Sequence, residues 1–504
     1  MRIASMTSNG WQGGRALLAL GIAIALGGCA VGPDYRRPEA PKAQTYAATP
    51  QAETTASTSA PGGEAQRLVK SMDIPGQWWT LFHSEPLNAL IADALKHNAD
   101  VDAAHAALQV AWENVYAQRA AYFPSVSAGV NPTRQDIAKD LASPAASGAS
   151  LYSLTTAQVS VSYAPDLWGG NRRQVESLVA DANAQRFQLE ATYLTLTSNL
   201  VNAAIGEASL RAQIDTSQRI IDLQTQVLDT LKRQYALGDV AETTVAAQVA
   251  TLEQSRATLP PLQKQLAQQR DLMAALSGRT PDQAIDASFT LDSLQLPAEL
   301  PMSLPAQLVE QRPDVRAAEE QLHAASADVG VAIANRLPNV QINASFGRAS
   351  EKASQLFSGG AGFWNLGGSI TQPLFDGGAL KHKQRAAEAS YRQAAAQYRG
   401  AVLGAVQNVA DTLHAIQADA DALVANERAE RAAARSLDIA RRQLALGDIS
   451  ESAMHTAELT WQQASLALVQ ARAARYADTV ALFQALGGGW WHRDDATALT
   501  SKAE

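Results

Sequence analysis

The chain contains one short turn sequence twice, and this repeat limits the possible folds more than any other feature. Residues 233–240 read RQYALGDV, and residues 442–449 read RQLALGDI. Two further pairs of stretches keep nearly the same spacing: FPSV (123–126) with LPNV (337–340), and APDLWGG (164–170) with QPLFDGG (372–378). A period this long indicates two copies of one unit, not a solenoid of short repeats. We therefore predict two related halves of one body, roughly residues 86–290 and 304–489.

Each half carries the seven-residue apolar spacing of a long, packed helix. In the first half this spacing runs from Gly170 to Leu237, and in the second from Gly378 to Leu446. A helix of that length extends roughly 100 Å. Helical stretches at 86–119 and 241–278 are each about half as long. We expect them to stack end to end, so that the helices form a wall of parallel rods.

The repeated turn has the composition of a tight helix-to-helix connection. Each copy offers a Gly for a left-handed helix end, an Asp for the next N-cap and a Glu that completes a capping box: Gly238, Asp239 and Glu242, then Gly447, Asp448 and Glu451. We expect each long helix to fold back at this turn. Two interpretations stay open, because these residues either only stop and restart helices or also contact a partner at the tip.

Between the helices lie four stretches in which apolar and polar residues alternate. They fall near residues 121–130, 151–164, 337–347 and 363–374, with small-residue loops at 131–150 and 348–362. Such strands suit a membrane β-barrel, and the alternative is a soluble hairpin packed on the helices. Four strands cannot close a barrel, and an eight-stranded barrel is filled by its own side chains. A pore therefore favours three chains and twelve strands.

The N-terminus has the layout of a secretory signal. Arg2 and Arg15 precede an apolar run that begins at Ala16. The run ends in a stretch that resembles a bacterial lipobox, made of Leu26, Gly27, Gly28 and Cys29. Cys29 is the only cysteine, so a disulfide within the chain is impossible. We predict a lipoprotein signal peptide at 1–28 and lipidation of Cys29; the alternative is an incidental cysteine in a discarded signal.

The signal also indicates where the protein goes and how the mature chain is divided. Ala30, rather than Asp, follows the cysteine, which resembles lipoproteins sent to the outer membrane. Residues 40–70 are rich in Ala, Thr, Ser, Pro and Gln and are interpreted as a flexible tether. The expected domains are a lipidated N-terminus and linker at 29–75, repeat 1 at 76–299, repeat 2 at 300–489 and a C-terminal tail at 490–504.

Charge and hydropathy argue against a nucleic-acid-binding protein and against a membrane-spanning helix in the mature chain. The net charge is −8 and no run of Lys and Arg occurs, so nucleic acid is not an expected partner. No window beyond residue 30 offers about 18 uninterrupted apolar residues, so we expect no membrane-spanning helix in the mature chain.

Several longer motifs together cover essentially the whole mature chain. They are CAVGPDYRRP (29–38), WWTLFHSEPLNALIADALKHNADV (78–101), QRPDVRAAE (311–319), PLFDGGALK (373–381) and LGGGW (486–490). With these motifs the chain resembles the lipoprotein branch of the TolC-like outer-membrane efflux factors, often called NodT-type.

The resemblance implies a fold class that is mainly α with a small β part. Long antiparallel helical hairpins would form a periplasmic tunnel, and a homotrimer would build a 12-stranded outer-membrane β-barrel. The protein would be the outer-membrane channel of a tripartite efflux pump, a passive exit duct for drugs or other small molecules. Implied partners are outer-membrane lipid, a periplasmic adaptor (membrane fusion) protein and an inner-membrane RND-type transporter. The tips that dock the adaptor would be Gly238, Asp239, Gly447 and Asp448.

Two positions depart from the expected pattern. The best-studied family members carry acidic residues six and nine positions after the second tip glycine, where this chain has Ala453 and Thr456. The acidic constriction ring therefore does not carry over, and capping or solvation explains the nearby Glu451 and Glu458. Pro260, followed by a second proline, should kink one return helix but not its twin, and so lower the symmetry of the tunnel from sixfold to threefold.

No catalytic pattern is found. The eight histidines are scattered, and HExxH, GxSxG and phosphate-loop motifs are absent. We expect no enzyme activity, catalytic residue, metal or cofactor, and we interpret His492 as part of a solvated tail. The alternative function is a structural periplasmic coiled-coil adaptor or scaffold lipoprotein without a pore.

Overall fold

The computed structural model describes residues 30–39, 45–46, 52–138, 150–283 and 285–493. These residues divide into two compact units. Unit 1 consists of residues 30–37, Leu108–Ala184 and Ala318–Gln397, and unit 2 of the described residues within Pro38–Ala107, Gln185–Ala317 and Tyr398 to 493. The predicted signal peptide (1–28) and the lipobox residues Leu26, Gly27, Gly28 and Cys29 lie outside the described residues, as does the tail from 494 to 504.

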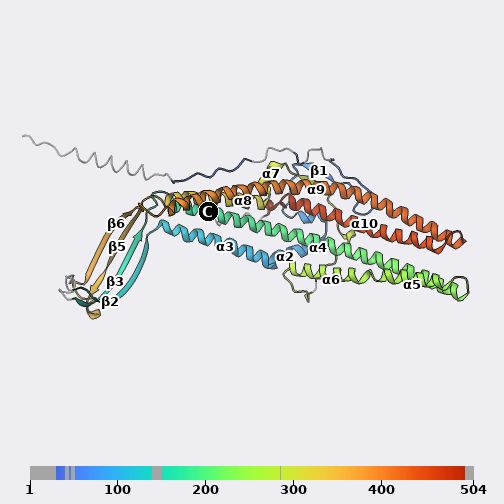
Figure 1. Ribbon diagram of the computed structural model, residues 1–504, viewed down its shortest axis with the longest axis horizontal. Helices are drawn as coiled ribbons and strands as arrows, with labels where there is room; N and C mark the ends of the chain where they lie inside the picture. Colours follow the sequence, from blue (N-terminus) through green and yellow to red (C-terminus); the bar gives the residue numbers. More distant parts are fainter. Residues whose placement is uncertain (1–29, 40–44, 47–51, 139–149, 284, 494–504) are drawn as a thin grey trace, which may run out of the picture. The chain divides into compact units, whose positions relative to one another are not determined.

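The order of elements is the same in the two halves of the chain, except that two helices of the first half, α5 and α6, correspond to the single helix α10 of the second (Figure 1). The first half contains α2 (Glu85–His97), α3 (Ala99–Arg119), β2 (Ser125–Asp136), β3 (Leu151–Tyr163), α4 (Gly170–Ala236), α5 (Glu242–Arg256) and α6 (Leu259–Leu276). The second half contains α7 (Pro305–Gln311), α8 (Pro313–Ala334), β5 (Asn339–Ser350), β6 (Gly362–Thr371), α9 (Ala379–Leu446) and α10 (Glu451–Ala485). Short 3-10 turns lie at Trp78–Phe82 (η1), Ala120–Tyr122 (η2), Leu291–Ser293 (η5), Ala353–Gln355 (η6) and Trp490–His492 (η7).

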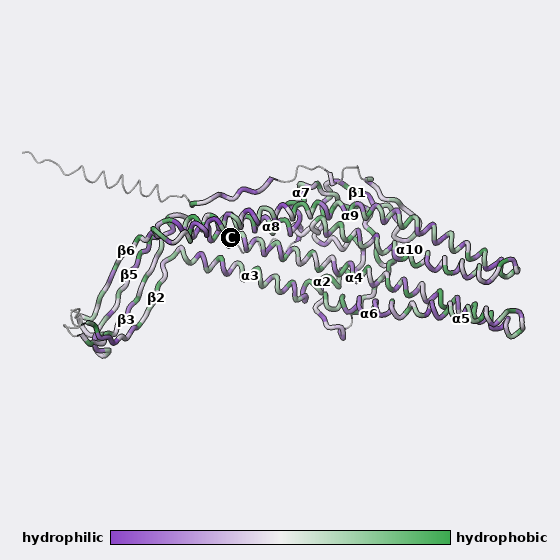
Figure 2. Tube along the Cα trace, in the orientation of Figure 1, coloured by the Kyte–Doolittle hydropathy of each residue, from purple (hydrophilic) through white to green (hydrophobic). Residues whose placement is uncertain are grey.

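The long helices predicted from the seven-residue spacing are confirmed. Helix α4 has 67 residues and α9 has 68. Members of the predicted apolar rows, such as Leu189, Leu196 and Leu200, are buried. Figure 2 shows hydrophobic and hydrophilic residues alternating along these helices. Within the described part of the chain, no helix is at once long and apolar enough to cross a membrane.

The prediction of a kink in the first return helix is also confirmed. The helical stretch expected at 241–278 is two helices, because α5 ends at Arg256 and α6 begins at Leu259 with proline in its first turn. Proline is tolerated there because the first N–H groups of a helix have no partner within it. The corresponding helix of the second half, α10, runs through 35 residues without interruption.

The four strands form one antiparallel sheet in unit 1, in the order β2-β3-β5-β6. The two boundaries of the first strand differ most from the prediction, and those of the other strands differ by at most three residues. The first strand begins at Ser125 rather than near 121, because Ala120–Tyr122 forms a 3-10 turn. It also continues to Asp136 through Pro132, which a sheet tolerates because β2 is an edge strand. The expected loop at 131–150 is therefore shorter, and its residues 139–149 lie outside the described residues.

The core of unit 2 gathers around the aromatic motif that follows the linker. The ring of Trp78 stacks on that of Phe483 at 5.2 Å, and the hydroxyl of Tyr476 donates to the Leu294 carbonyl at 2.9 Å. A two-stranded parallel sheet of β1 (Arg67–Lys70) and β4 (Glu299–Met302) lies in the same unit. The packing joins the segment around Trp78 to α10.

The expectation of a flexible tether over 40–70 is wrong for residues 52–70. Strand β1 lies in this stretch, and Thr55 and Gln66 are buried. Arg475 of α10, itself fully buried, donates hydrogen bonds to the carbonyls of Gly62 (3.1 Å) and Glu64 and to the Thr55 hydroxyl. The polar composition misled because two backbone carbonyls and the Thr55 hydroxyl of this segment accept hydrogen bonds from a buried cation.

The start of the expected C-terminal tail is packed as well. Trp490 donates its indole N–H to the Gln311 carbonyl at 2.7 Å and contacts Phe187 edge to face. His492 is exposed, as interpreted from the sequence, and its Nε2 atom lies 2.6 Å from Asp73. Residues 490–493 therefore belong to unit 2.

Candidate functional site

The sheet of unit 1 has two chemically different faces. The strand register places directly paired residues on the same side, as with Val126 opposite Val161 and Ala344 opposite Leu366. One face carries Val126, Ala128, Val130, Ala157, Val159, Val161, Val340, Ile342, Ala344, Phe346, Trp364, Leu366 and Ile370. The other carries Ser125, Ser127, Asn131, Thr133, Gln158, Ser160, Ser162, Gln341, Asn343, Ser345, Asn365 and Ser369. We call these the apolar face and the polar face.

The apolar face is exposed. Trp364 has 79% of its surface accessible and Ile370 has 74%, and Val126, Val130 and Phe346 are exposed too. Isolated apolar residues on a protein surface need no explanation, but a contiguous patch of this kind marks an interaction site. Alternation of apolar and polar residues across a sheet is the pattern of a membrane barrel wall.

Both edges of this sheet are free of any partner strand among the described residues. β2, with 12 residues, forms one edge, and β6, with 10, forms the other. An edge strand presents N–H and C=O groups that pair readily with a strand from another chain. The strands β3 and β5 between them are paired on both sides.

The two repeated turns have nearly identical backbone geometry. Gly238 has φ +84° and Gly447 has φ +80°, so both adopt the predicted left-handed conformation. The Asp239 N–H donates to the Gln234 carbonyl at 2.9 Å, and the Asp448 N–H donates to the Gln443 carbonyl at 2.9 Å. These bonds have the six-to-one spacing of a Schellman motif, which closes the long helix.

The predicted capping boxes are wrong. The N-cap of α5 is Ala241, which has no capping side chain, and the N-cap of α10 is Ser450, whose hydroxyl accepts from the Ala453 N–H. Asp239 and Asp448 lie two residues before these caps and help to close the preceding helix through their backbone. The first turn of the next helix begins only at Glu242 or Glu451, after an extended residue.

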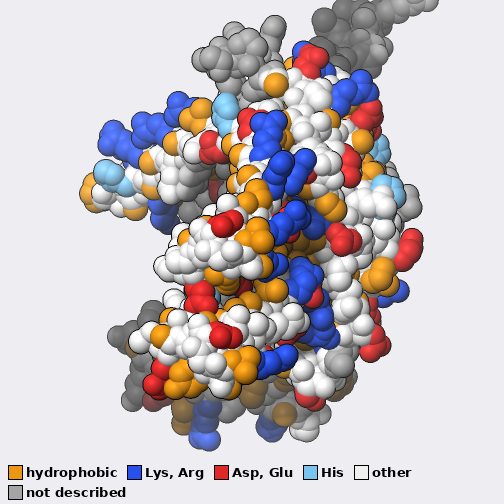
Figure 3. All heavy atoms as spheres, turned by 90° about the vertical axis from the view of Figure 1, so that its right-hand side faces the viewer, with side chains coloured by type: hydrophobic (Ala, Val, Ile, Leu, Met, Phe, Trp, Pro, Cys, Tyr) orange, Lys and Arg blue, Asp and Glu red, His pale blue; other side chains and the backbone are white. Residues whose placement is uncertain are grey.

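Both turns lie at the same end of unit 2 (Figure 1), and each exposes a leucine. Leu237 is 77% accessible and Leu446 is 76%, and Asp239 and Asp448 are exposed beside them. Figure 3 turns this end toward the viewer and shows acidic and hydrophobic side chains together on the surface. The tip is therefore a pair of similar, solvent-exposed protrusions.

The two positions at which other family members carry the acidic residues of a constriction ring are exposed on α10. Ala453 and Thr456 carry no charge there, and Glu451 begins the helix. Glu458 is not solvated as the sequence suggested, because only 1% of it is accessible. Both of its carboxylate oxygens lack a hydrogen-bond partner among the described residues, and His455 Nδ1 lies 3.7 Å away.

The residues directly after Cys29 form a strap on α4 and α8 of unit 1. The Val31 N–H donates to the Trp168 carbonyl at 3.0 Å. Gly32 has φ +101°, and a side chain there would meet the backbone of Gly330, with 2.4 Å between its Cβ and the Gly330 Cα. This close approach fixes where the strap crosses α8.

Charged and aromatic side chains hold the same strap. Arg173 of α4 binds Asp34 at 2.6 Å and Glu176 at 2.8 Å. The Tyr35 ring stacks on His323 at 4.3 Å. His323 contacts Glu320 and Glu176, which raise its pKa against the opposing effect of burial. Sequence reasoning missed this cluster, because the residues are spread over three segments and only the close glycines hint at it.

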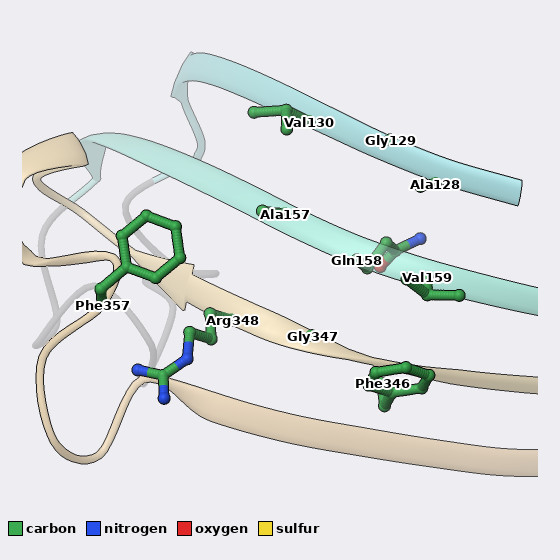
Figure 4. A pocket seen from close by; sticks show the side chains of 10 residues that line it. All are labelled: Ala128, Gly129, Val130, Ala157, Gln158, Val159, Phe346, Gly347, Arg348 and Phe357. Carbon is green, nitrogen blue, oxygen red and sulfur yellow. The ribbon is translucent and has the colours of Figure 1, made fainter.

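No metal centre is present among the described residues, since no group of three or more His, Cys, Asp or Glu side chains converges there. A hollow instead lies on the apolar face of the sheet in unit 1, with a volume of about 470 Å³ (Figure 4). Its lining is mostly small, aliphatic and aromatic, with Gln158 as a polar residue and Arg348 as its one charged residue. The arrangement is suited to contact with lipid and offers no nucleophile or acid–base pair.

Comparison with known proteins agrees with this geometry. The model of the outer membrane efflux protein family matches residues 90–279 and 304–488. The chain is 28% identical over 490 residues to the probable efflux pump outer membrane protein TtgC of Pseudomonas putida, covering 95% of this chain and 96% of the relative. It is 29% identical to the pyoverdine export outer membrane protein OpmQ of Pseudomonas aeruginosa, covering 84% and 90%.

A solved structure of the outer-membrane channel OprN is similar in fold. The TM-score is 0.80 at 27% identity, and the match covers 92% of this chain and all of that one. The two segments matched by the family model contain the helical hairpins and the four strands. The chain therefore belongs to the outer membrane efflux protein family and is an outer-membrane efflux channel protein.

Proposed function

We propose that three copies of this chain close their sheets into one twelve-stranded barrel, the passive exit duct of a tripartite efflux pump. The observation that carries the proposal is the two-faced sheet with two free edges. Lipid cannot satisfy the N–H and C=O groups of an open edge, so the edges must pair before the sheet can sit in a bilayer. Pairing β6 of one copy with β2 of the next removes every edge and leaves the polar face around a lumen.

Purified full-length protein tests this proposal in two measurements. Native mass spectrometry in detergent should give a trimer, and planar bilayers should show conductance. Deleting residues 362–371, which form β6, should abolish both insertion and conductance, because one edge would stay unpaired. A wild-type protein that is monomeric or dimeric as its main species, or that never conducts, would contradict the channel and favour the scaffold alternative.

We further propose that the tips around Gly238, Asp239, Gly447 and Asp448 dock a periplasmic adaptor. The support is the exposed leucine before each glycine, because burying exposed apolar surface favours protein–protein association. Replacing both glycines with Val should distort the tips, since a β-branched residue is strained at positive φ. Drug accumulation in cells carrying the cognate pump should rise at unchanged outer-membrane protein level.

The matched control for the tips replaces both glycines with Asn, which tolerates the left-handed conformation. Nothing lies within 4 Å of a side chain built at either glycine, so space does not distinguish Val from Asn. If the Val and Asn variants export and cross-link to the adaptor equally well, the tips are only helix ends.

We propose that Cys29 carries acyl chains that hold the mature N-terminus in the outer membrane. The lipobox motivates this, and the strap supports it by fixing Ala30 against Gly169 in unit 1. Each buried CH₂ of a lipid chain contributes about 0.8 kcal/mol. Mass spectrometry should show an acylated Cys29 as the first residue. Cys29→Ala should weaken assembly without abolishing it; an unmodified mature N-terminus in the wild type overturns the assignment.

The transported compounds are proposed as drugs or other small molecules that an inner-membrane RND-type transporter selects. OpmQ is named for pyoverdine export and TtgC only for efflux, so the relatives differ in what their names specify. Among the described residues, the polar face of the sheet carries no charged side chain that would select one compound. Co-expression with candidate adaptor and transporter genes, followed by drug accumulation assays, identifies the cognate system.

A further inference from the structure

The apolar face of the sheet changes character toward the loops that follow β2 and β5. Aliphatic side chains such as Val126 and Ile370 lie nearer its other end, whereas Phe346, Trp364 and Arg348 lie toward the loops. Aromatic girdles mark the two boundaries of the apolar band on membrane barrels. A charged residue on the lipid face is costly at mid-membrane but nearly neutral near the boundary. Arg348 therefore indicates where the headgroups begin.

Arg348 stands at the rim of the hollow on this face. Its strand partners are Ala157 of β3 and Gly362 of β6, so the residues directly opposite it in the sheet are small. The Phe357 ring, from the loop between β5 and β6, lies 5.9 Å from it. Figure 4 shows this ring and the Arg348 side chain together at the loop end of the hollow.

The guanidinium is held in place yet keeps donors available. Its Nη1 atom donates to the Ser358 carbonyl at 3.1 Å, which is its only hydrogen bond to the described residues. Arginine has five N–H donors and forms paired hydrogen bonds with phosphate. Arg134 of β2 lies on the same face, and Lys352 follows the end of β5. The carboxylates of Asp136 and Glu351 lie still closer to the loops, so Arg348 is the cation best placed above the hollow.

We propose that this hollow binds a phosphorylated lipid of the outer leaflet, with an acyl chain against Val159 and Phe346 and the phosphate on Arg348. The ligand class is a multi-acylated lipid with a phosphate headgroup, as in lipopolysaccharide. The hollow of about 470 Å³ supplies apolar contact, and Arg348 supplies the complementary charge. This inference rests on the proposed barrel, because only a sheet in the membrane presents its apolar face to lipid.

The experiment uses the full-length protein purified in mild detergent. Diphosphorylated lipid A, the same lipid without phosphates, and inorganic phosphate are the three probes, and native mass spectrometry measures bound lipid. Wild type should bind the diphosphorylated lipid about tenfold more tightly than the dephosphorylated form, and Arg348→Gln should remove that difference. Inorganic phosphate should not compete at equal phosphate concentration, because it lacks acyl chains.

Two further variants distinguish binding in the hollow from a general effect of removing an arginine. Ala157→Leu fills the hollow without adding charge and should weaken binding of both lipids. Arg399→Gln removes an exposed arginine from α9 and should bind as wild type. Equal binding of phosphorylated and dephosphorylated lipid by wild type, or unchanged binding in Arg348→Gln, would overturn the site.

Conductance measured on the same samples distinguishes failure of the lipid site from failure of the proposed duct. A wild-type trimer that conducts but shows no phosphate preference overturns the lipid site and leaves the duct intact. A wild-type sample that forms no trimer and never conducts overturns the proposed duct, and the lipid site with it.

Discussion

The two helical hairpins of unit 2 start with almost the same turn and return along different paths. Gly238 and Gly447 close α4 and α9 with equivalent hydrogen bonds. The first hairpin then returns in two helices, α5 and α6, whereas the second returns in the unbroken α10. The comparison shows that a short motif fixes the turn itself, while residues about twenty positions later decide the course of the helix that follows it.

The strongest way to break this comparison is to give the second hairpin the break of the first. Val469 of α10 corresponds to Pro260 in the aligned repeats. Val469→Pro should destabilise the protein by about 3 kcal/mol or more, because proline removes a hydrogen bond and clashes inside a helix. Thermal unfolding followed by circular dichroism, at one protein and detergent concentration, should show a clear fall in Tm. Val469→Ala is the control; equal Tm values for the two variants would contradict the prediction.

A second difference is the buried acid of the second hairpin. The position equivalent to Glu458 is Val249, which is 38% accessible. Replacing Glu458 with Met should stabilise the protein by roughly 1–3 kcal/mol, because a buried polar group without partners is unfavourable. Thermal unfolding measures the gain, with Val249→Met as a near-neutral control. A lower Tm for Glu458→Met would instead show that a neighbouring subunit supplies hydrogen bonds to the carboxylate.

The helix caps provide a smaller test that works in both directions. Ser450→Ala should weaken the start of α10 by about 1 kcal/mol, and Ala241→Ser should strengthen the start of α5 by a similar amount. Hydrogen exchange at the first turns of α5 and α10 reports the two changes separately. If exchange at Ala453 is the same in wild type and Ser450→Ala, the hydroxyl bond of 3.3 Å is not significant.

The smallest expected effect concerns pH and an acid pair in the second half only. Burial, followed by the neighbouring Asp419, raises the pKa of Asp478 to about 6; the equivalent residues in the first half are Leu210 and Gln269. The folded protein then holds more protons than the unfolded chain between about pH 4 and pH 6. Stability should therefore fall as pH rises through that window.

Asp478→Asn should remove part of this slope, by a modest amount because the carboxyl is half-exposed. Tm measured at pH 4, 5 and 6 for wild type and variant tests this. The raised pKa of His323 also makes stability fall as pH rises above about 6.5. This contribution is the same in wild type and in Asp478→Asn, so it does not affect the difference between them. An identical slope in wild type and Asp478→Asn would exclude the pair as its source.

Local patterns in the sequence predicted the long helices, the four strands, the left-handed glycines and the break near Pro260. Each of these depends on neighbours within a few turns, so the information lies close by in the chain. The caps were predicted wrongly because Asp239 and Asp448 carry the right chemistry two residues too early. Which residue caps a helix depends on where the backbone first becomes helical, and a stretch such as DISE allows more than one starting point.

The order of the polar stretch before residue 70 could not be predicted from local sequence. Its order depends on Arg475, more than four hundred residues away, and no local pattern contains that contact. The same holds for the strap, where Arg173 and His323 come from different helices. The two faces of the sheet were evident from alternation, but the register that aligns Arg348 with Ala157 and Gly362 was not.

Arg475 also sets an order on the synthesis and export of the chain. The ribosome makes Gly62 and Glu64 long before it makes their partner, and the sequence separations are 413 and 411 residues. Contacts between such distant residues form late, because a large loop must close first. A chain that stops before α10 therefore leaves the carbonyls of Gly62 and Glu64 without their buried partner. Completion of unit 2 reports that translation and export have reached the C-terminal helix.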